Sequence, residues 1–133
     1  AVTEQDPYGP DGEPFPTTYY LTCRHLVAAV SRIEAAGGVE RWTAAVAADP
    51  ALGRALRDAS ARQAAIRHEL AVGRVGRDDG ASLVTGIGGS RRPERLKCLH
   101  AHVAYALAQP GYLLGDAILA EVPDRWPERC CSA

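Results

Sequence analysis

The side chains with the greatest capacity for chemistry in this 133-residue sequence are its four cysteines and four histidines. The stretch RLKCLHAHVAYAL, residues 95–107, places Cys98, His100 and His102 close together. Residues four apart are neighbours on an α-helix, so Cys98 and His102 are expected to share one flank while His100 points toward the core side. Thiolate and imidazole are ligands that zinc and iron accept in proteins.

A zinc or iron site is therefore the first interpretation of these residues. Four such ligands make a closed structural site, and three leave an open coordination position. The predicted ligands are Cys23, Cys98, His102, Cys130 and Cys131. None of their spacings is a CxxC knuckle. The opposite interpretation is that Cys98 is a small buried hydrophobic residue and His102 a hydrogen-bonded core histidine.

Thiol chemistry is a second interpretation of the cysteines. Cys23 is expected near a helix N-terminus, a position that favours the thiolate, and Cys98 has an imidazole partner in His102. Either residue then suits a nucleophile or a persulfide carrier, and vicinal Cys130 and Cys131 suit a redox pair. The residue types leave the question of catalysis open.

An anion site is a third interpretation, and it concerns a different segment. The stretch TGIGGSRRPERLK, residues 85–97, leads a glycine-rich loop into a predicted helix N-terminus, where free N–H groups favour anions. The predicted contacts are Gly86, Gly88, Gly89, Arg92, Lys97 and His100. The stretch is neither a P-loop nor a dinucleotide fingerprint. A plain loop, whose glycines permit positive φ and close packing, is the alternative.

Five helices are expected to position these residues, because apolar residues recur at helical spacing between glycine and proline stops. The expected ranges are 22–36, 39–48, 50–72, 92–109 and 112–121. Asp49 and Pro50 predict the start of the third helix, and Pro93 that of the fourth. Arg67 is assigned to the charged, solvent-facing side of the third helix.

The expected fold is an all-α single small domain. Residues 1–21 form an extended proline-rich arm, residues 22–122 the helical domain, and residues 123–133 a C-terminal tail. The run TTYYL, residues 17–21, is β-prone but has no convincing second strand, so it is expected to be extended chain. A long irregular loop, residues 73–90, precedes the fourth helix.

Composition narrows the function classes. The chain has 15 basic and 16 acidic residues without long runs of either sign, which argues against a nucleic-acid or anionic-membrane binder. No apolar run approaches the roughly 18 residues of a membrane span, and the start of the chain is unlike a signal peptide. A cytoplasmic protein is expected.

Four motifs together resemble one known family. PFPTTYYLTC (14–23), VSRIEAAGG (30–38), GIGG (86–89) and KCLHAHVAYAL (97–107) occur in the order found in the bacterial family catalogued as domain of unknown function 501. Members usually read TCP where this chain has a cysteine followed by Arg24. The family has no established activity. In actinobacteria its genes lie near those of a septum-formation protein and an exopolyphosphatase, which implies a cell-division or polyphosphate-related context.

A non-catalytic protein-interaction module is the remaining alternative. The proline-rich arm carries an aromatic set, Phe15, Tyr19 and Tyr20, that would suit docking to a protein partner. The same residues also suit packing on the protein's own core. The expected partners are thus a protein or a small anion.

Overall fold

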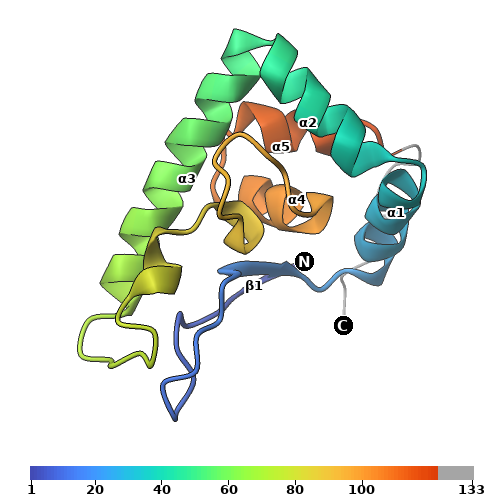
Figure 1. Ribbon diagram of the computed structural model, residues 1–133. Helices are drawn as coiled ribbons and strands as arrows, with labels where there is room; N and C mark the ends of the chain where they lie inside the picture. The colour runs from blue at the N-terminus through green and yellow to red at the C-terminus, as the bar shows by residue number, and fades with distance from the viewer. Residues whose placement is uncertain (123–133) are drawn as a thin grey trace.

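The longest helix, α3 (Pro50–Leu70), forms one side of the molecule, and the other elements are arranged against it (Figure 1). The computed structural model describes residues 1–122. Asp49 begins α3 by accepting a hydrogen bond from the amide of Ala51 at 2.9 Å, and Pro50 occupies the first turn. The predicted start of this helix is confirmed, and its physical cause is the predicted N-cap.

Five helices dominate the described residues, which confirms the predicted fold class. The other four helices are α1 (Arg24–Ala35), α2 (Gly38–Ala48), α4 (Leu99–Ala108) and α5 (Leu113–Leu119). Two short 3₁₀ turns, η1 (Ala81–Val84) and η2 (Ile87–Gly89), lie in the glycine-rich loop. Within residues 1–122, no helix combines the length and the apolar character needed to cross a bilayer.

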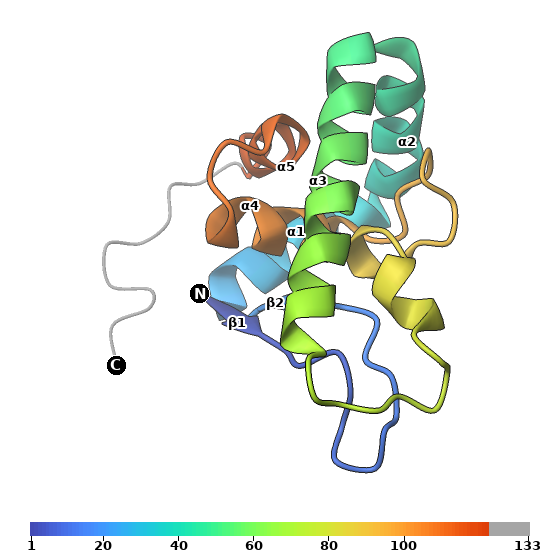
Figure 2. The same cartoon turned by 90° about the vertical axis from the view of Figure 1, so that its left-hand side faces the viewer.

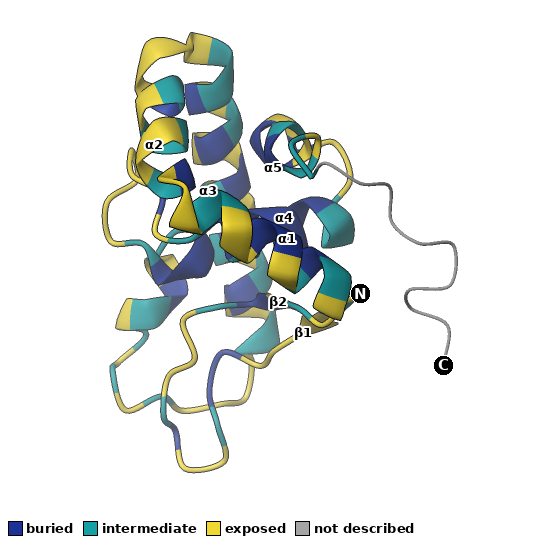
Figure 3. Cartoon of the chain, turned by 90° about the vertical axis from the view of Figure 1, so that its right-hand side faces the viewer, coloured by how far each residue is buried: buried dark blue, intermediate teal, exposed yellow. Residues whose placement is uncertain are grey.

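In Figure 1, helix α4 lies inside the frame formed by α1, α2 and α3, and Figure 2 shows it between α5 on one side and β1 and β2 on the other. It contacts α5, α1, η2 and both strands. Every residue from Leu99 to Ala106 except His100 is buried, whereas α1 and α2 turn exposed faces outward (Figure 3). A helix that is apolar on all sides is stable only inside the protein, as the sequence pattern indicated.

A two-stranded antiparallel sheet covers one side of α4, and this corrects the expectation of unpaired extended chain. Strand β1 (Val2–Glu4) pairs with β2 (Tyr19–Leu21), with Thr3 opposite Tyr20. Buried Tyr19 makes an edge contact with Tyr105 of α4, with ring centroids 5.9 Å apart. The N-terminal segment therefore folds back on itself, and packing on α4 stabilises strands too short to form alone.

The start of α4 also differs from the prediction. The helix begins at Leu99, and residues 90–98 before it are irregular. Cys98 is the N-cap, with extended backbone angles (φ −154°, ψ 146°), and its Sγ accepts the amide of Ala101 at 3.4 Å. Pro93 is compatible with the start of a helix. The side chains that accept hydrogen bonds from the first amides of α4, however, lie next to Leu99, where the helix begins.

Helix α5 packs closely on α4 at Gly115. A Cβ atom at this position would lie 2.6 Å from the Cβ of Ala106 and 2.7 Å from the carbonyl oxygen of His102. Both helices are buried here, so α4 and α5 cannot separate without opening the core. The close approach depends on the missing side chain.

We predict that Gly115→Ala lowers the free energy of unfolding by about 1–3 kcal/mol through overpacking. The matched control is Gly53→Ala in α3, where a Cβ would meet its nearest neighbours at 3.4 Å and where alanine favours the helix by up to about 1 kcal/mol. Urea unfolding of both variants tests this. A Gly115→Ala protein as stable as wild type would show that α5 packs differently.

Candidate functional site

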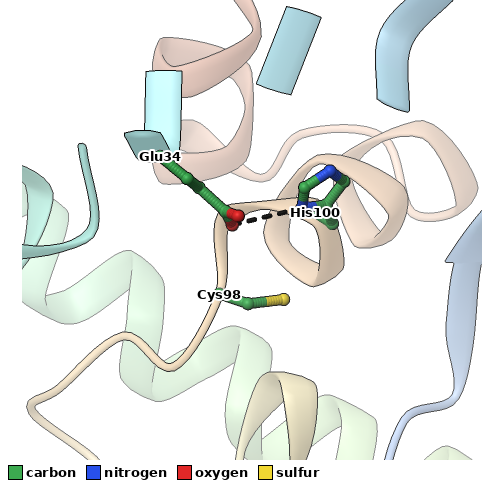
Figure 4. Close-up of side chains that lie close together, drawn as sticks. All are labelled: Glu34, Cys98 and His100. Carbon is green, nitrogen blue, oxygen red and sulfur yellow. Dashed lines mark hydrogen bonds and ion pairs between the residues drawn. The ribbon is translucent and has the colours of Figure 1, made fainter. Parts of the chain in front are cut away.

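Three potential metal ligands meet where the end of α1 approaches the start of α4. They are Glu34, Cys98 and His100, and one ligand atom from each lies within 4.8 Å of the other two. Figure 4 shows Glu34 reaching from α1 toward His100, with the Cys98 thiol beside them. Within the described residues, no other group of three His, Cys, Asp or Glu residues satisfies this distance.

One face of α1 holds the His100 ring in place. Val27, Ser31 and Glu34 lie on a single stripe of this helix, because positions 0, 4 and 7 of an α-helix share a face. The His100 Nδ1 is 3.1 Å from the Glu34 Oε1, and its Nε2 is 3.2 Å from both the Val27 carbonyl oxygen and the Ser31 hydroxyl. Both ring nitrogens are therefore fixed by α1.

Two members of the group also satisfy the first amides of α4. The Glu34 Oε1 accepts the Leu99 amide at 2.6 Å, and the Cys98 Sγ accepts that of Ala101. Free N–H groups at a helix N-terminus favour negative charge. The carboxylate and the sulfur atom therefore act together as caps of the first turn of α4.

The charge on His100 follows from these neighbours. Its pKa is raised to about 9, first by the side chain of Cys98 and further by the negative charge of Glu34 and the Val27 carbonyl, while burial opposes the shift. The ring is therefore an imidazolium near neutral pH, and both of its N–H groups have acceptors. The side chains of His100 and Glu34 are 26% and 25% exposed, so a small ligand can reach them.

His102 does not join this group, which corrects the expected pairing with Cys98. The wheel argument assumed that the helix includes Cys98, but this residue is the N-cap, where the backbone is extended. His102 is fully buried, and its Nδ1 is 2.8 Å from the hydroxyl of Tyr112. This geometry matches the alternative of a hydrogen-bonded core histidine.

Cys23 is also separate from the Glu34 group. It is buried at the N-cap of α1, and Glu34 lies eleven residues later on that helix, roughly 16 Å away along its axis. Cys130 and Cys131 lie outside the described residues. Of the predicted metal ligands within residues 1–122, only Cys98 therefore belongs to the group that the structure brings together.

The residues predicted to contact an anion do not all lie in one site. Gly88 and Gly89 have positive φ values of 70° and 76°, and added Cβ atoms would meet Ala101 at 3.2 Å and Pro16 at 2.6 Å. Their packing matches the alternative of a plain loop. Gly86, Gly89 and Lys97 line one cleft, while Arg92 lines a neighbouring one. His100 belongs to the Glu34 group.

Sequence reasoning missed Glu34. A single glutamate near the end of an amphipathic helix is typical of a solvent-facing side. The sequence feature that could have identified Glu34 is its spacing. It lies seven residues after Val27, on the face of α1 that meets α4. Recognising it required the α1–α4 contact, because the two partners are 66 residues apart.

The two histidines of α4 predict separate pH effects on stability. Burial lowers the pKa of His102 to about 4. The contribution of this residue to stability is therefore complete above the pKa of histidine in the unfolded chain, about 6.5, and is lost as the pH falls toward 4. His100 acts in the opposite direction. Its contribution is complete below about 6.5 and is lost as the pH rises toward 9.

We therefore predict that His102→Asn removes one component of the acid destabilisation of wild type between pH 6.5 and 4. The shift corresponds to at most about 3 kcal/mol in the free energy of unfolding. Asparagine retains a polar atom for Tyr112 but cannot titrate. Urea unfolding at several pH values measures the difference, and His68→Asn on the exposed side of α3 is the control. Parallel pH profiles for wild type and His102→Asn would contradict the assignment.

Comparison with known proteins gives a family but no function. The family model described as "Protein of unknown function (DUF501)" matches residues 1–120, so the chain belongs to this family. No curated protein matches the sequence. No solved structure matches it either.

Proposed function

We propose that this member of the DUF501 family binds a divalent transition metal, zinc or ferrous iron, through Glu34, Cys98 and His100. The observation that carries the proposal is the convergence of three different ligand types, from two helices distant in sequence, within 4.8 Å. A carboxylate oxygen, a thiolate sulfur and an imidazole nitrogen together suit zinc, and iron accepts the same donors.

The surroundings of His100 support this proposal. Histidines that bind metals usually donate the other ring N–H to a carbonyl or carboxylate, which fixes the tautomer and the ring orientation. The Nε2 of His100 lies 3.2 Å from the Val27 carbonyl oxygen, which leaves Nδ1 on the side of Glu34 and Cys98. Metal binding would displace the proton now held between Nδ1 and the carboxylate, as expected for ligands that bind in their deprotonated forms.

Three protein ligands leave at least one coordination position open. Zinc sites with three protein ligands usually hold a water molecule or a substrate at the fourth position. All three residues of the group are partly exposed, so solvent can reach the ion. The site therefore suits exchange of a small ligand at the metal better than a closed structural role.

Cys98→Ser is the sharpest test of the metal site. Serine is a good N-cap, so this variant keeps the start of α4 while it removes the thiolate. We expect zinc affinity, measured by competition with a chromophoric chelator, to fall at least about tenfold. Cobalt bound to wild type should show sulfur-to-metal charge-transfer absorption, and this band should be absent from Cys98→Ser.

Glu34→Gln gives an independent measurement, because glutamine keeps an oxygen for the Leu99 amide but lacks the charge. It should also weaken zinc binding. His68→Asn, which changes an exposed histidine far from the group in sequence, is the control and should bind zinc as wild type does. Equal zinc affinity in wild type, Cys98→Ser and Glu34→Gln would rule out the proposed ligands.

Thiol chemistry at Cys98 is a second candidate function, favoured by one specific observation. The Cys98 sulfur accepts an amide at the start of α4, and its side chain interacts with the protonated ring of His100, which places a thiol beside an imidazole as in thiol nucleophile sites. In this arrangement Cys98 is the thiol, His100 is the neighbouring imidazole, and Glu34 orients the His100 ring. The thiolate would then act as a nucleophile or persulfide carrier.

Alkylation kinetics separate this candidate from a passive thiol. Metal-free protein at pH 6.5 should react with iodoacetamide at Cys98 at least about tenfold faster than free cysteine does. Peptide mapping identifies the modified residue, and Cys98→Ser is the control. A rate no higher than that of free cysteine would reject nucleophilic activation. Protection of Cys98 by zinc would support the metal site instead.

A further inference from the structure

The arginines of α3 do not share one environment. Arg67, assigned from the sequence to the solvent-facing side, is 0% exposed, and its Nη1 donates to the hydroxyl of Thr18 at 3.2 Å. That assignment was therefore wrong. Arg54 and Arg62 are exposed, and no ion pair found within residues 1–122 includes either of them. Both line one cleft beside α3, so their charges are available to a ligand there.

This cleft lies between α3 and the turn that joins α4 to α5. Its volume is about 580 Å³, within the range of small-molecule sites, roughly 300–1,000 Å³. One wall is a single stripe of α3, the other is formed by residues 109–113, and Tyr105 of α4 also lines the cleft. Figure 1 shows α4 between α3 and α1, so the cleft and the Glu34 group lie on different sides of α4.

The hydroxyl of Tyr105 is a polar group without a partner in this cleft. Tyr105 is only 2% exposed, and its ring makes edge contacts with Tyr19 and Tyr112, with centroids 5.9 and 5.1 Å away. The hydroxyl has no hydrogen bond within the described residues, and it is not among the polar atoms that are fully enclosed without a partner. It is therefore the atom through which this buried side chain reaches the cleft. Buried polar side chains normally have a partner, so its position points to a ligand.

Arg62 is held close to this hydroxyl. Its Nε donates to the Oε1 of Gln109 on the other wall at 3.2 Å, and the Nε2 of Gln109 donates to the Tyr19 hydroxyl at 3.1 Å. One nitrogen of the guanidinium is thus fixed, and both Nη groups remain without a partner among the described residues. Burial raises the pKa of Tyr105, and the positive charge of Arg62 opposes this shift. The two groups are therefore within electrostatic reach of each other.

These polar groups favour a carboxylate. A guanidinium donates charge-assisted hydrogen bonds to carboxylate oxygens, and a tyrosine hydroxyl can donate to the same group. Among the lining residues, Arg54 and Arg62 supply two positive charges and Asp58 one negative charge, which leaves an excess of one positive charge. An anionic group is therefore attracted to the cleft, and the Nη groups of Arg62 and the Tyr105 hydroxyl can bind it.

The rest of the lining favours an organic ligand over a bare inorganic anion. Ala51, Ala55 and Ala59 recur every four residues along the α3 wall, and Leu113, which is 50% exposed, lines the other wall. An apolar body of a few carbon atoms would remove this surface from water, whereas an inorganic anion would leave it hydrated. The combination of an apolar lining with a few polar groups is typical of small-molecule sites.

We propose that this cleft binds a small apolar carboxylic acid in its ionised form, with Arg62 and the Tyr105 hydroxyl as inner contacts and Arg54 at the mouth. The apolar body of the ligand lies along the alanines of α3. The site is independent of the proposed metal site, because it shares no residue with the Glu34 group.

Tyr105→Phe separates a binding role of the hydroxyl from a structural one. Phenylalanine keeps the ring contacts with Tyr19 and Tyr112, and the hydroxyl that it lacks has no partner within the described residues. The variant should therefore unfold at the same or a higher temperature than wild type when no ligand is present. A clearly lower unfolding temperature would show that the hydroxyl stabilises the fold, and would overturn its assignment as a ligand contact.

The binding test uses benzoate as the probe and benzyl alcohol as a neutral control with the same ring, in the presence of a chelator. We expect benzoate, and not benzyl alcohol, to shift the amide NMR signals of Gly111 and Leu113 in a saturable way. The dissociation constant of benzoate should rise about tenfold or more in Tyr105→Phe and in Arg62→Gln, because each variant loses a hydrogen bond to a charged group.

A second pair of variants keeps the test valid if those changes alter the fold. Arg54 and Arg57 are both exposed arginines of α3, but only Arg54 lines the cleft. Arg54→Gln should weaken benzoate binding, and Arg57→Gln should bind benzoate as wild type does. The proposal is overturned if benzoate shifts the two amides no more than benzyl alcohol does. It is also overturned if Arg54→Gln and Arg57→Gln bind benzoate alike.

Discussion

The first turn of α4 lies inside the protein. Much of the structure depends on the side chains that accept the hydrogen bonds of its first amides. Leu99 and Ala101, whose amides begin the helix, are buried, and side chains accept the hydrogen bonds of both amides. Cys98 supplies one acceptor from within the segment, and Glu34 supplies another from α1. This second bond ties two helices that are distant in sequence and thereby places a carboxylate beside a thiol and an imidazole.

The two histidines of α4 show how position on one buried helix determines protonation. His100 faces α1, where a carboxylate, a sulfur atom and a carbonyl favour its charged form. His102 faces the opposite side, where the hydroxyl of Tyr112 is its polar contact and burial favours the neutral form. The same residue type therefore belongs to the Glu34 group at one position and to the core at the other.

Sequence patterns predicted the helices wherever the signals that start and stop them are local. Asp49 with Pro50 and the glycines after α1 are examples, and the observed ends lie close to the expected ones. The start of α4 was missed because one of its caps, Glu34, comes from another helix. The β1–β2 pairing was missed because each strand has three residues and is stabilised by contact with α4.

The candidate sites were less predictable for the same reason. Cys98 and His100 were recognised as chemical residues, but their association depends on extended backbone at the N-cap, which a helical wheel cannot represent. Arg67 was assigned to solvent because α3 carries many arginines, but it is fully buried and donates from Nη1 to the hydroxyl of Thr18 in the N-terminal segment. Tertiary contacts, which periodicity does not encode, decide both cases.

The segment before α4 lies between a surface cleft and the Glu34 group. Lys97 lines the cleft, while Cys98, the next residue, belongs to the Glu34 group. The backbone at Cys98 is extended, and successive side chains of extended chain point to opposite sides, so adjacent residues can line different surfaces. A helix beginning at Pro93, as the sequence suggested, would have placed both residues on neighbouring helical faces. The irregular approach to α4 is therefore what allows a surface cleft and a soft-ligand group to form on either side of one short segment.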